Sequence, residues 1–279
     1  MEFFIPLDEW VNLAFDKINS FISPTLRAIS VYLEAFINNF EDLLTWPLPI
    51  ITMIVLAAIV WIVSDRKIGI FTFIGLLVAY VIGVWDETMS TVALALSGTI
   101  ITLLFGIPIG ILSSQSNLAE RIVRPILDFM QTLPSFVYLI PAVMFFGMGK
   151  TAALFATMIF AMPPAVRMTN LGIRNVSKEM IEAATAFGSS RRQTLFDVQL
   201  PLAMPTIMAG VNQCIMLALS MTVIASMIGA GGLGNVVLKS MQTLDIGSGF
   251  VGGLSIVILA ILLDRLTENL AKKREKKLQ

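Results

Sequence analysis

Long apolar runs separated by short polar stretches fill the sequence from residue 47 onward. A bilayer core of about 30 Å requires roughly 20 mostly apolar residues for each helical crossing. We expect seven segments to meet this requirement within a few residues, the fourth beginning earlier, near Ile126, with a kink between Leu133 and Pro134. The segments are 48–64, 68–85, 90–112, 134–148, 151–170, 205–228 and 247–263. The pattern predicts an all-α integral membrane protein with about seven transmembrane helices, the first two being antiparallel neighbours.

Residues 1–46 follow a different pattern, in which apolar residues recur at three- and four-residue spacings between charged ones. No uncharged run here is long enough to cross a bilayer, so the pattern favours amphipathic helices lying on the membrane. The segment holds seven acidic and two basic residues, a poor match to a cytoplasmic flank. We therefore expect an extracellular amphipathic segment at the N-terminus.

The distribution of Lys and Arg predicts the orientation of the remaining chain. When the basic tail at 268–279 is placed in the cytoplasm, fifteen basic residues fall inside and four fall outside. Adding or removing one crossing would mix the two groups. The N-terminus is therefore predicted outside, and the C-terminus and the loop at 177–205 are predicted in the cytoplasm.

Composition supports a membrane protein and excludes several kinds of catalytic site. Hydrophobic residues make up 56% of the chain, charged residues 14%, and the mean hydropathy is +0.84. Histidine is absent and Cys214 is the single cysteine, so a histidine triad, a cysteine-based metal site and an internal disulfide are all excluded. We expect no metal site, no enzymatic activity, no cleaved signal peptide and no nucleic-acid partner.

The long polar interruption at 177–205 has helical punctuation of its own. Ser177 is a candidate N-cap, Gly188 is suited to ending the first helix, and Ser189 or Ser190 is suited to capping a second. The pattern predicts a small helical hairpin at a membrane surface. The small side chains at Ala183 and Ala184 would allow a partner protein to approach closely.

The spacing within this hairpin resembles the EAA loop of permease subunits of ATP-binding-cassette (ABC) importers. Val198 stands where that family usually has isoleucine, a change of one methylene. The resemblance implies that the hairpin couples the permease to an ATPase. The residues that carry it are Glu182, Ala183, Ala184, Gly188, Leu200 and Pro201.

Three further runs, at 125–134, 160–168 and 229–234, are similar to permeases of glycine betaine and proline betaine importers. This resemblance implies a type-1 ABC transmembrane domain at 88–267, preceded by two accessory helices at 47–87. It also implies a bacterial cell membrane location, a permease homodimer, two separate ATPase subunits that hold ATP and Mg²⁺, and an extracellular substrate-binding protein. The implied cargo is glycine betaine or a related quaternary-ammonium osmoprotectant.

Polar side chains within apolar segments are costly and mark candidate pathways. Asn212 and Gln213 are consecutive, so at most one is expected to face a pathway while the other bonds a neighbouring helix. For Arg167 and Asp264, near the ends of their segments, we expect side chains that reach the membrane surface. The candidate pathway residues are Gln131, Thr132, Asn212, Gln213 and Ser220.

The glycine-rich run at 229–234 invites comparison with a phosphate-binding loop. No Gly-Lys-Ser/Thr follows it, and it comes after an apolar helix instead of a strand. We expect a tight external turn at the end of the sixth crossing.

Other functional classes remain open at this point. An ABC permease for another small solute such as an amino acid would share the same pattern. An ion-coupled secondary transporter would normally carry acidic residues deep in the membrane, whereas Asp128 and Asp264 lie near segment ends. A membrane scaffold would give no reason for the EAA spacing.

Overall fold

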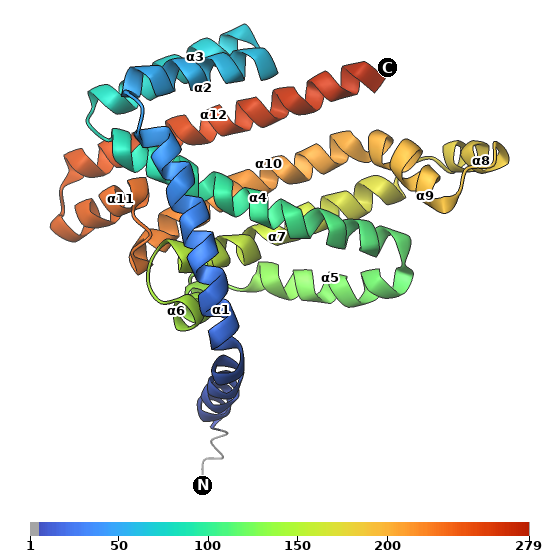
Figure 1. The fold of residues 1–279 in the computed structure, drawn as a ribbon, viewed down its shortest axis with the longest axis horizontal. Coiled ribbons are helices and arrows are strands. Elements are labelled where there is room, and N and C mark those ends of the chain that lie inside the picture. The colour runs from blue at the N-terminus through green and yellow to red at the C-terminus, as the bar shows by residue number, and fades with distance from the viewer. Residues whose placement is uncertain (1–5, 279) are drawn as a thin grey trace.

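The computed structural model describes residues 6–278, and all regular secondary structure within this range is helical (Figure 1). Residues 1–5, and the side chains of the basic tail from 271 onward, lie outside the described part. The α-helices are α1 Leu7–Thr45, α2 Pro49–Val63, α3 Arg66–Val81, α4 Trp85–Gln115, α5 Asn117–Thr132, α6 Leu139–Phe146, α7 Lys150–Arg174, α8 Lys178–Ala186, α9 Arg191–Gln193, α10 Leu200–Ala225, α11 Gly232–Thr243 and α12 Ile246–Leu278. Three short elements join them: η1 Ser135–Tyr138, η2 Thr194–Gln199 and η3 Ser226–Ile228.

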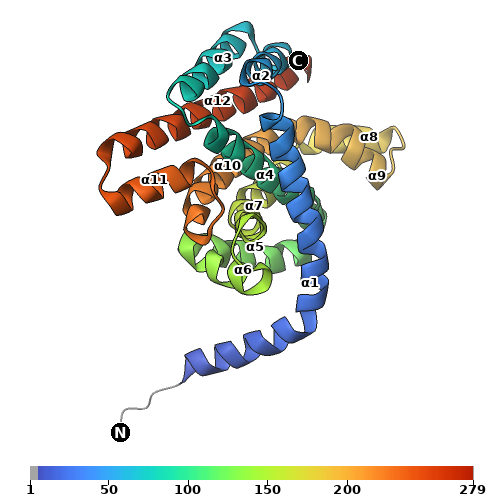
Figure 2. The same cartoon turned by 60° about the vertical axis from the view of Figure 1, so that its left-hand side comes forward.

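Helices α4, α7, α10 and α12 run along the long axis and form the centre of the fold (Figures 1 and 2). Small residues let α4 and α7 pack closely: a Cβ added at Gly98 would lie 2.7 Å from Thr157, and one at Gly106 would lie 2.9 Å from Ala165. The constant sequence offset shows that α4 and α7 are parallel. Glycine therefore allows a close contact between α4 and α7, as expected where apolar helices pack in a membrane.

Helices α2 and α3 form the expected antiparallel pair and pack beside α12 (Figure 1). The turn between them is tight because Asp65 caps α3 by accepting a hydrogen bond from the backbone N–H of Arg66. Gly69 lies against Trp61, with 2.8 Å between an added Cβ and the tryptophan Cβ. Gly75 meets Ile258 of α12 in the same way.

Helix α1 has 39 residues, with Pro24 inside it, and is bent; its second half runs across the bundle (Figures 1 and 2). Ile37 in its second half is fully buried in a cluster with Leu94 of α4 and Met221 of α10. The first half projects beyond the bundle and exposes 87% of Phe21. An amphipathic helix was expected here, and its second half proves to be part of the core.

The fourth predicted crossing differs from the structure. Helix α6 has only eight residues, and α5 and the η1–α6 segment meet at 109° because the backbone is extended at Leu133 and Pro134. Both α5 and α6 pack against α7. The kink expected between Leu133 and Pro134 is thus present as a sharp bend, and α5 with the η1–α6 segment could form one bent span.

Within the described residues, four helical stretches are long and apolar enough to cross a membrane. They are Trp85–Gln115, Lys150–Arg174, Arg191–Ile228 and Ile246–Leu270. Two bent pairs could add one span each: Pro24–Thr45 with Pro49–Val63, at 103°, and Asn117–Thr132 with Ser135–Phe146. Helices α2 and α3, with 15 and 16 residues, are short for separate crossings.

The glycine-rich run forms the turn that was expected. Gly229 and Gly231 have φ angles of 82° and 81°, and the chain reverses there between η3 and α11. The Thr91 hydroxyl accepts a hydrogen bond from the backbone N–H of Leu233 at 2.8 Å, which fixes the turn to α4. The run is thus a structural turn.

Candidate functional site

Helices α8 and α9 form a hairpin that projects from one end of the bundle, away from α11 and α6 (Figures 1 and 2). Helix α7 leads into the hairpin, and η2 and α10 lead out of it. A Cβ at Gly172 would lie 3.1 Å from Thr206, so the two supporting helices are in close contact at its base. The hairpin is therefore attached to two central helices that pack tightly together.

Local sequence signals determine the shape of the hairpin. Gly188 has φ 85°, a conformation that favours glycine, and no atom lies within 4 Å of an added Cβ there. Ser190 begins α9 with a capping box, in which Gln193 bonds back to the Ser190 backbone. Ser177 occupies the N-cap position of α8 but makes no capping hydrogen bond with its side chain. The predicted turn and second cap are confirmed.

The base of the hairpin contains a π-helical turn, η2. Pro201 follows it and has no N–H, so it cannot donate the hydrogen bond that an α-helix would need at this point. The N–H of Leu200 donates to the carbonyl of Leu195, five residues back. The turn connects the hairpin to the straight part of α10, and π-turns of this kind are frequent at functional sites.

The six residues of the EAA resemblance occupy two different environments. Glu182, Ala183 and Gly188 are exposed on the hairpin and Ala184 is half-buried. At its base, Leu200 packs with Ile173 and Ala203, and Pro201 is half-buried beside it. Phe187 at the turn is 91% exposed, so the hairpin has an apolar contact residue that the motif does not include. The hairpin thus presents an uncovered surface with apolar, acidic and basic side chains.

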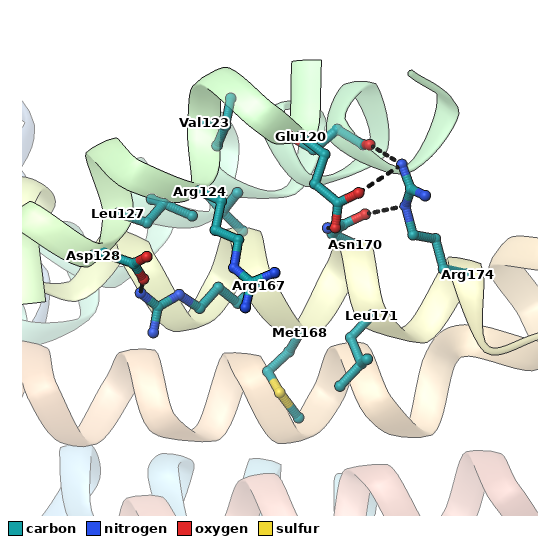
Figure 3. Close-up of a pocket in the computed structure, with 12 residues that line it drawn as sticks. Glu120, Val123, Arg124, Leu127, Asp128, Arg167, Met168, Asn170, Leu171 and Arg174 are labelled. Atoms are coloured by element: carbon teal, nitrogen blue, oxygen red, sulfur yellow. Dashed lines mark hydrogen bonds and ion pairs between the residues drawn. The ribbon is translucent and has the colours of Figure 1, made fainter. Parts of the chain in front are cut away.

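Two ion pairs connect α5 to α7 just before the hairpin (Figure 3). Arg174 Nη2 lies 3.1 Å from Glu120 Oε2, and Arg167 Nη2 lies 2.5 Å from Asp128 Oδ1. Arg167 therefore pairs with a carboxylate of α5, a partner that the sequence analysis did not give it. Sequence analysis missed this connection, although acidic residues at 120 and 128 and arginines at 167 and 174 share similar spacing on two helices.

The candidate pathway residues do not form one cluster. Gln131 accepts a hydrogen bond from Arg167, and Thr132 caps its own helix end by donating to the Phe129 carbonyl. Gln213 and Ser220 are both exposed on α10, seven residues apart and therefore on one face. The structure thus brings two of the five residues together on α10 and leaves two at the end of α5.

Asn212, the fifth candidate, faces α12 and not the exposed side of α10. Its side-chain N–H donates to Asp264 at 2.9 Å, and its oxygen accepts from Thr267. Asn212 thus bonds a neighbouring helix, whereas Gln213 is exposed on α10; which of the two faces a pathway stays a prediction. The half-buried Asp264 carboxylate therefore bonds α10, a contact that the sequence analysis did not include.

Comparison with known proteins gives a consistent picture. The profile of a family described as "Binding-protein-dependent transport system inner membrane component" matches residues 103–276. The chain is 49% identical over 265 residues to the glycine betaine/proline betaine transport system permease protein ProW of Escherichia coli (strain K12), covering 95% of this chain and 75% of ProW. It is 47% identical over 271 residues to the glycine betaine transport system permease protein OpuAB of Bacillus subtilis (strain 168), covering 97% and 96%.

Among solved structures, the chain is similar to the MetNI methionine ABC transporter in inward-facing conformations. The TM-score is 0.63 with 21% sequence identity, and the match covers 70% of this chain and 95% of the other. At that identity the likeness concerns the fold, which is that of a type-1 ABC permease.

Proposed function

Because this chain belongs to the family of binding-protein-dependent transport system inner membrane components, we propose that it is the permease subunit of an ATP-driven importer. We propose glycine betaine or a related quaternary-ammonium osmoprotectant as the cargo. Relatives that match almost the full chain, including the glycine betaine/carnitine transport permease protein GbuB of Listeria monocytogenes, support this choice.

The observation that carries the proposal is the projecting hairpin. Its tip exposes Glu182, Ala183 and Phe187, and its base is continuous with the packed helices α7 and α10. A rigid projection of this form can transmit force from a separate protein into the bundle, since packed helices switch between discrete arrangements. We assign ATPase coupling to Glu182, Ala183, Ala184, Gly188, Leu200 and Pro201.

The mechanism we propose is mechanical. Two ATPase subunits, which hold ATP and Mg²⁺, close on ATP binding and move the hairpins of two permease copies. Helices α7 and α10 then tilt with the hairpin and open the pathway toward an extracellular substrate-binding protein. Hydrolysis on the ATPases resets the helices. In this scheme the permease itself performs no chemical step.

We propose an orientation with the N-terminus outside and the hairpin and C-terminus in the cytoplasm of a bacterial cell. The distribution of basic residues supports it. We keep seven crossings, with the bent segment of α5, η1 and α6 as the fourth, and with α2 and α3 as accessory helices ahead of a type-1 domain at 88–267. Residues 1–46 then lie on the outer side, and 268–279 form a basic cytoplasmic tail.

We assign the exposed face of α10 to the pathway. Gln213 and Ser220 present polar groups on this face, and polar side chains exposed on an apolar helix are expected to meet water or a solute. Gln131 and Thr132, at the end of α5, are the second candidates. Asn212 serves instead to join α10 to α12.

The test is uptake of labelled glycine betaine and substrate-stimulated ATP hydrolysis in proteoliposomes that contain this chain and its ATPase and binding-protein partners. We expect Gly188→Asp to insert normally and to lose stimulated hydrolysis. Gly188→Asn is the matched control, since asparagine tolerates positive φ better than most residues and the site has room for it. Unchanged stimulation of ATP hydrolysis in Gly188→Asp would refute the coupling role. Uptake of an amino acid in place of betaine would refute the proposed cargo and leave the permease role unchanged.

A further inference from the structure

A cavity of about 430 Å³ lies between α5, α7 and the end of α4, on the side of the bundle that carries the hairpin (Figure 3). Three arginines and two carboxylates line it, so one positive charge is in excess. Its remaining wall is largely apolar. The lining residues are Ser113, Glu120, Val123, Arg124, Leu127, Asp128, Val166, Arg167, Met168, Asn170, Leu171 and Arg174.

Arg124 carries the excess charge. Both carboxylates of the cavity are already paired, Glu120 with Arg174 and Asp128 with Arg167. Arg124 makes no hydrogen bond or ion pair with any residue that the structure describes. Its side chain points from α5 toward α7, between the two ion pairs (Figure 3). Residue 124 is exposed, so its unpaired guanidinium is accessible to an anion that enters the cavity from outside.

A second polar group in the cavity wall also lacks a partner. Ser113 is only 2% exposed, and its Oγ has no hydrogen-bond partner within the described part of the chain. Buried polar groups normally have one. Arg124 and Ser113 together provide donors for an anion, one charged and one neutral.

We propose that this cavity binds the phosphate group of an anionic phospholipid. Arginine binds phosphate through two parallel hydrogen bonds, and basic pockets between membrane helices on the cytoplasmic side suit such headgroups. The apolar wall formed by Val123, Leu127 and Leu171 can contact the glycerol backbone and the first methylene groups. Free phosphate from the cytosol shares the same chemistry. The proposed orientation, part of the proposed function, places this site in the cytoplasmic leaflet. Phosphate binding in the cavity does not depend on this orientation.

The composition of the cavity argues against the transported betaine as its occupant. A quaternary ammonium group is held best over aromatic rings, and no aromatic residue lines the cavity. The two carboxylates that could attract a cation are occupied by arginines. The site is thus distinct from the pathway assigned to α10.

A bound phosphate would strengthen the connection between α5 and α7. It would bridge Arg124 of α5 to groups on α4 and α7, beside the two existing ion pairs. Helix α7 ends at Arg174, and only three residues separate it from α8, the first helix of the hairpin. The lipid would therefore brace the segment that supports the hairpin.

The test measures lipid binding to the purified full-length permease in detergent by native mass spectrometry, so it needs no transport activity. Phosphatidylglycerol is titrated against Arg124→Gln and against Arg121→Gln, a matched control on the same helix whose exposed arginine does not line the cavity. We expect Arg124→Gln to raise the dissociation constant about tenfold, since one charge-assisted contact is lost. Arg121→Gln should leave it within about twofold.

Three outcomes would overturn the proposal: equal binding to wild type and Arg124→Gln, an equal loss in both variants, or equal binding of phosphatidylcholine and phosphatidylglycerol. Competition by millimolar inorganic phosphate at equal affinity would support the phosphate site and name free phosphate as its source. If Arg124→Gln is not monodisperse, Arg124→Lys gives the same test. An ammonium group cannot bind phosphate through a planar fork, so a roughly threefold weaker affinity is expected.

Discussion

Asn212 donates a hydrogen bond to the carboxylate of Asp264, with 2.9 Å between Nδ2 and Oδ1, and thereby joins α10 to α12. The Thr267 hydroxyl donates to the Asn212 oxygen from the same helix. The two helices therefore share a polar connection between otherwise apolar surfaces, where Ile215 packs against Leu262 and Leu263.

Removing this amide should destabilise the fold. Asn212→Ala leaves the Asp264 carboxylate without its side-chain donor, which is expected to cost about 1–3 kcal/mol. The neighbouring Gln213→Ala is the matched control, because that amide is exposed and has no partner within residues 6–278; it should change stability by about 0.5 kcal/mol or less. Thermal unfolding in detergent, followed by near-ultraviolet circular dichroism, compares the two. Equal midpoints would contradict the role given to Asn212.

The long transverse helix α1 should depend on one ion pair. Lys150 Nζ lies 2.5 Å from Glu41 Oε2, and both side chains are largely buried, with 29% and 20% exposure. Lys150→Met should lower stability by about 1–3 kcal/mol, since it leaves a largely buried carboxylate unpaired. It should also speed proteolysis within α1.

Exchanging the two charges provides the control for this pair. A Lys150→Glu, Glu41→Lys double variant should recover at least part of the loss, whereas each single reversal should be worse than Lys150→Met. If the double variant is as unstable as the single ones, packing and not charge anchors α1.

Close packing of α4 on α7 should make Gly110 intolerant of even one methyl group. A Cβ there would lie 2.6 Å from Thr169 Cβ and 2.8 Å from the Val166 carbonyl oxygen. Gly110→Ala should cost about 1–3 kcal/mol, because one helix must shift. Gly253→Ala in α12 meets no atom within 4 Å and should be neutral or slightly stabilising. The measurement is the thermal unfolding midpoint of Gly110→Ala and of Gly253→Ala in detergent. Similar midpoints for the two variants would contradict the packing argument.

The start of α12 should respond to acid. Asp245 accepts hydrogen bonds from the Ser248 hydroxyl, at 2.7 Å, and from the Ser248 backbone N–H, at 3.1 Å. These hydrogen bonds, the hydroxyl one first, lower the pKa of Asp245 below its ordinary value of 3.8. A lowered pKa stabilises the folded state fully above about 3.8, and this stabilisation is lost as the pH falls through the folded pKa.

Asp245→Asn should remove this pH dependence while keeping the cap, since asparagine is also a good N-cap residue. The measurement is the unfolding midpoint of wild type and variant between pH 5 and the lowest pH at which the protein stays soluble. If the midpoints of wild type and Asp245→Asn fall in parallel below the ordinary pKa of the carboxyl, Asp245 does not contribute to the pH dependence of stability.

The sequence alone determined the elements whose signals are local or whose surface must be apolar. Continuous apolar runs predicted α4, α7, α10 and α12, because a helix that crosses a bilayer needs apolar side chains whatever its neighbours are. Gly188 and Ser190 predicted the hairpin turn and its second cap, because positive φ and N-capping depend on a few adjacent residues.

The tertiary structure decided where charge could be placed within the bundle. Helix α5 carries Glu120, Arg124 and Asp128, so the search for apolar runs placed the fourth crossing at 134–148 with a start near Ile126 and did not include the first half of α5. Two of these charges are neutralised by arginines of α7, some forty to fifty residues later in the chain. The same holds for Asp264, whose partner lies on another helix. A partner beside a charged group stabilises it between helices, and that pairing exists only once the helices have packed.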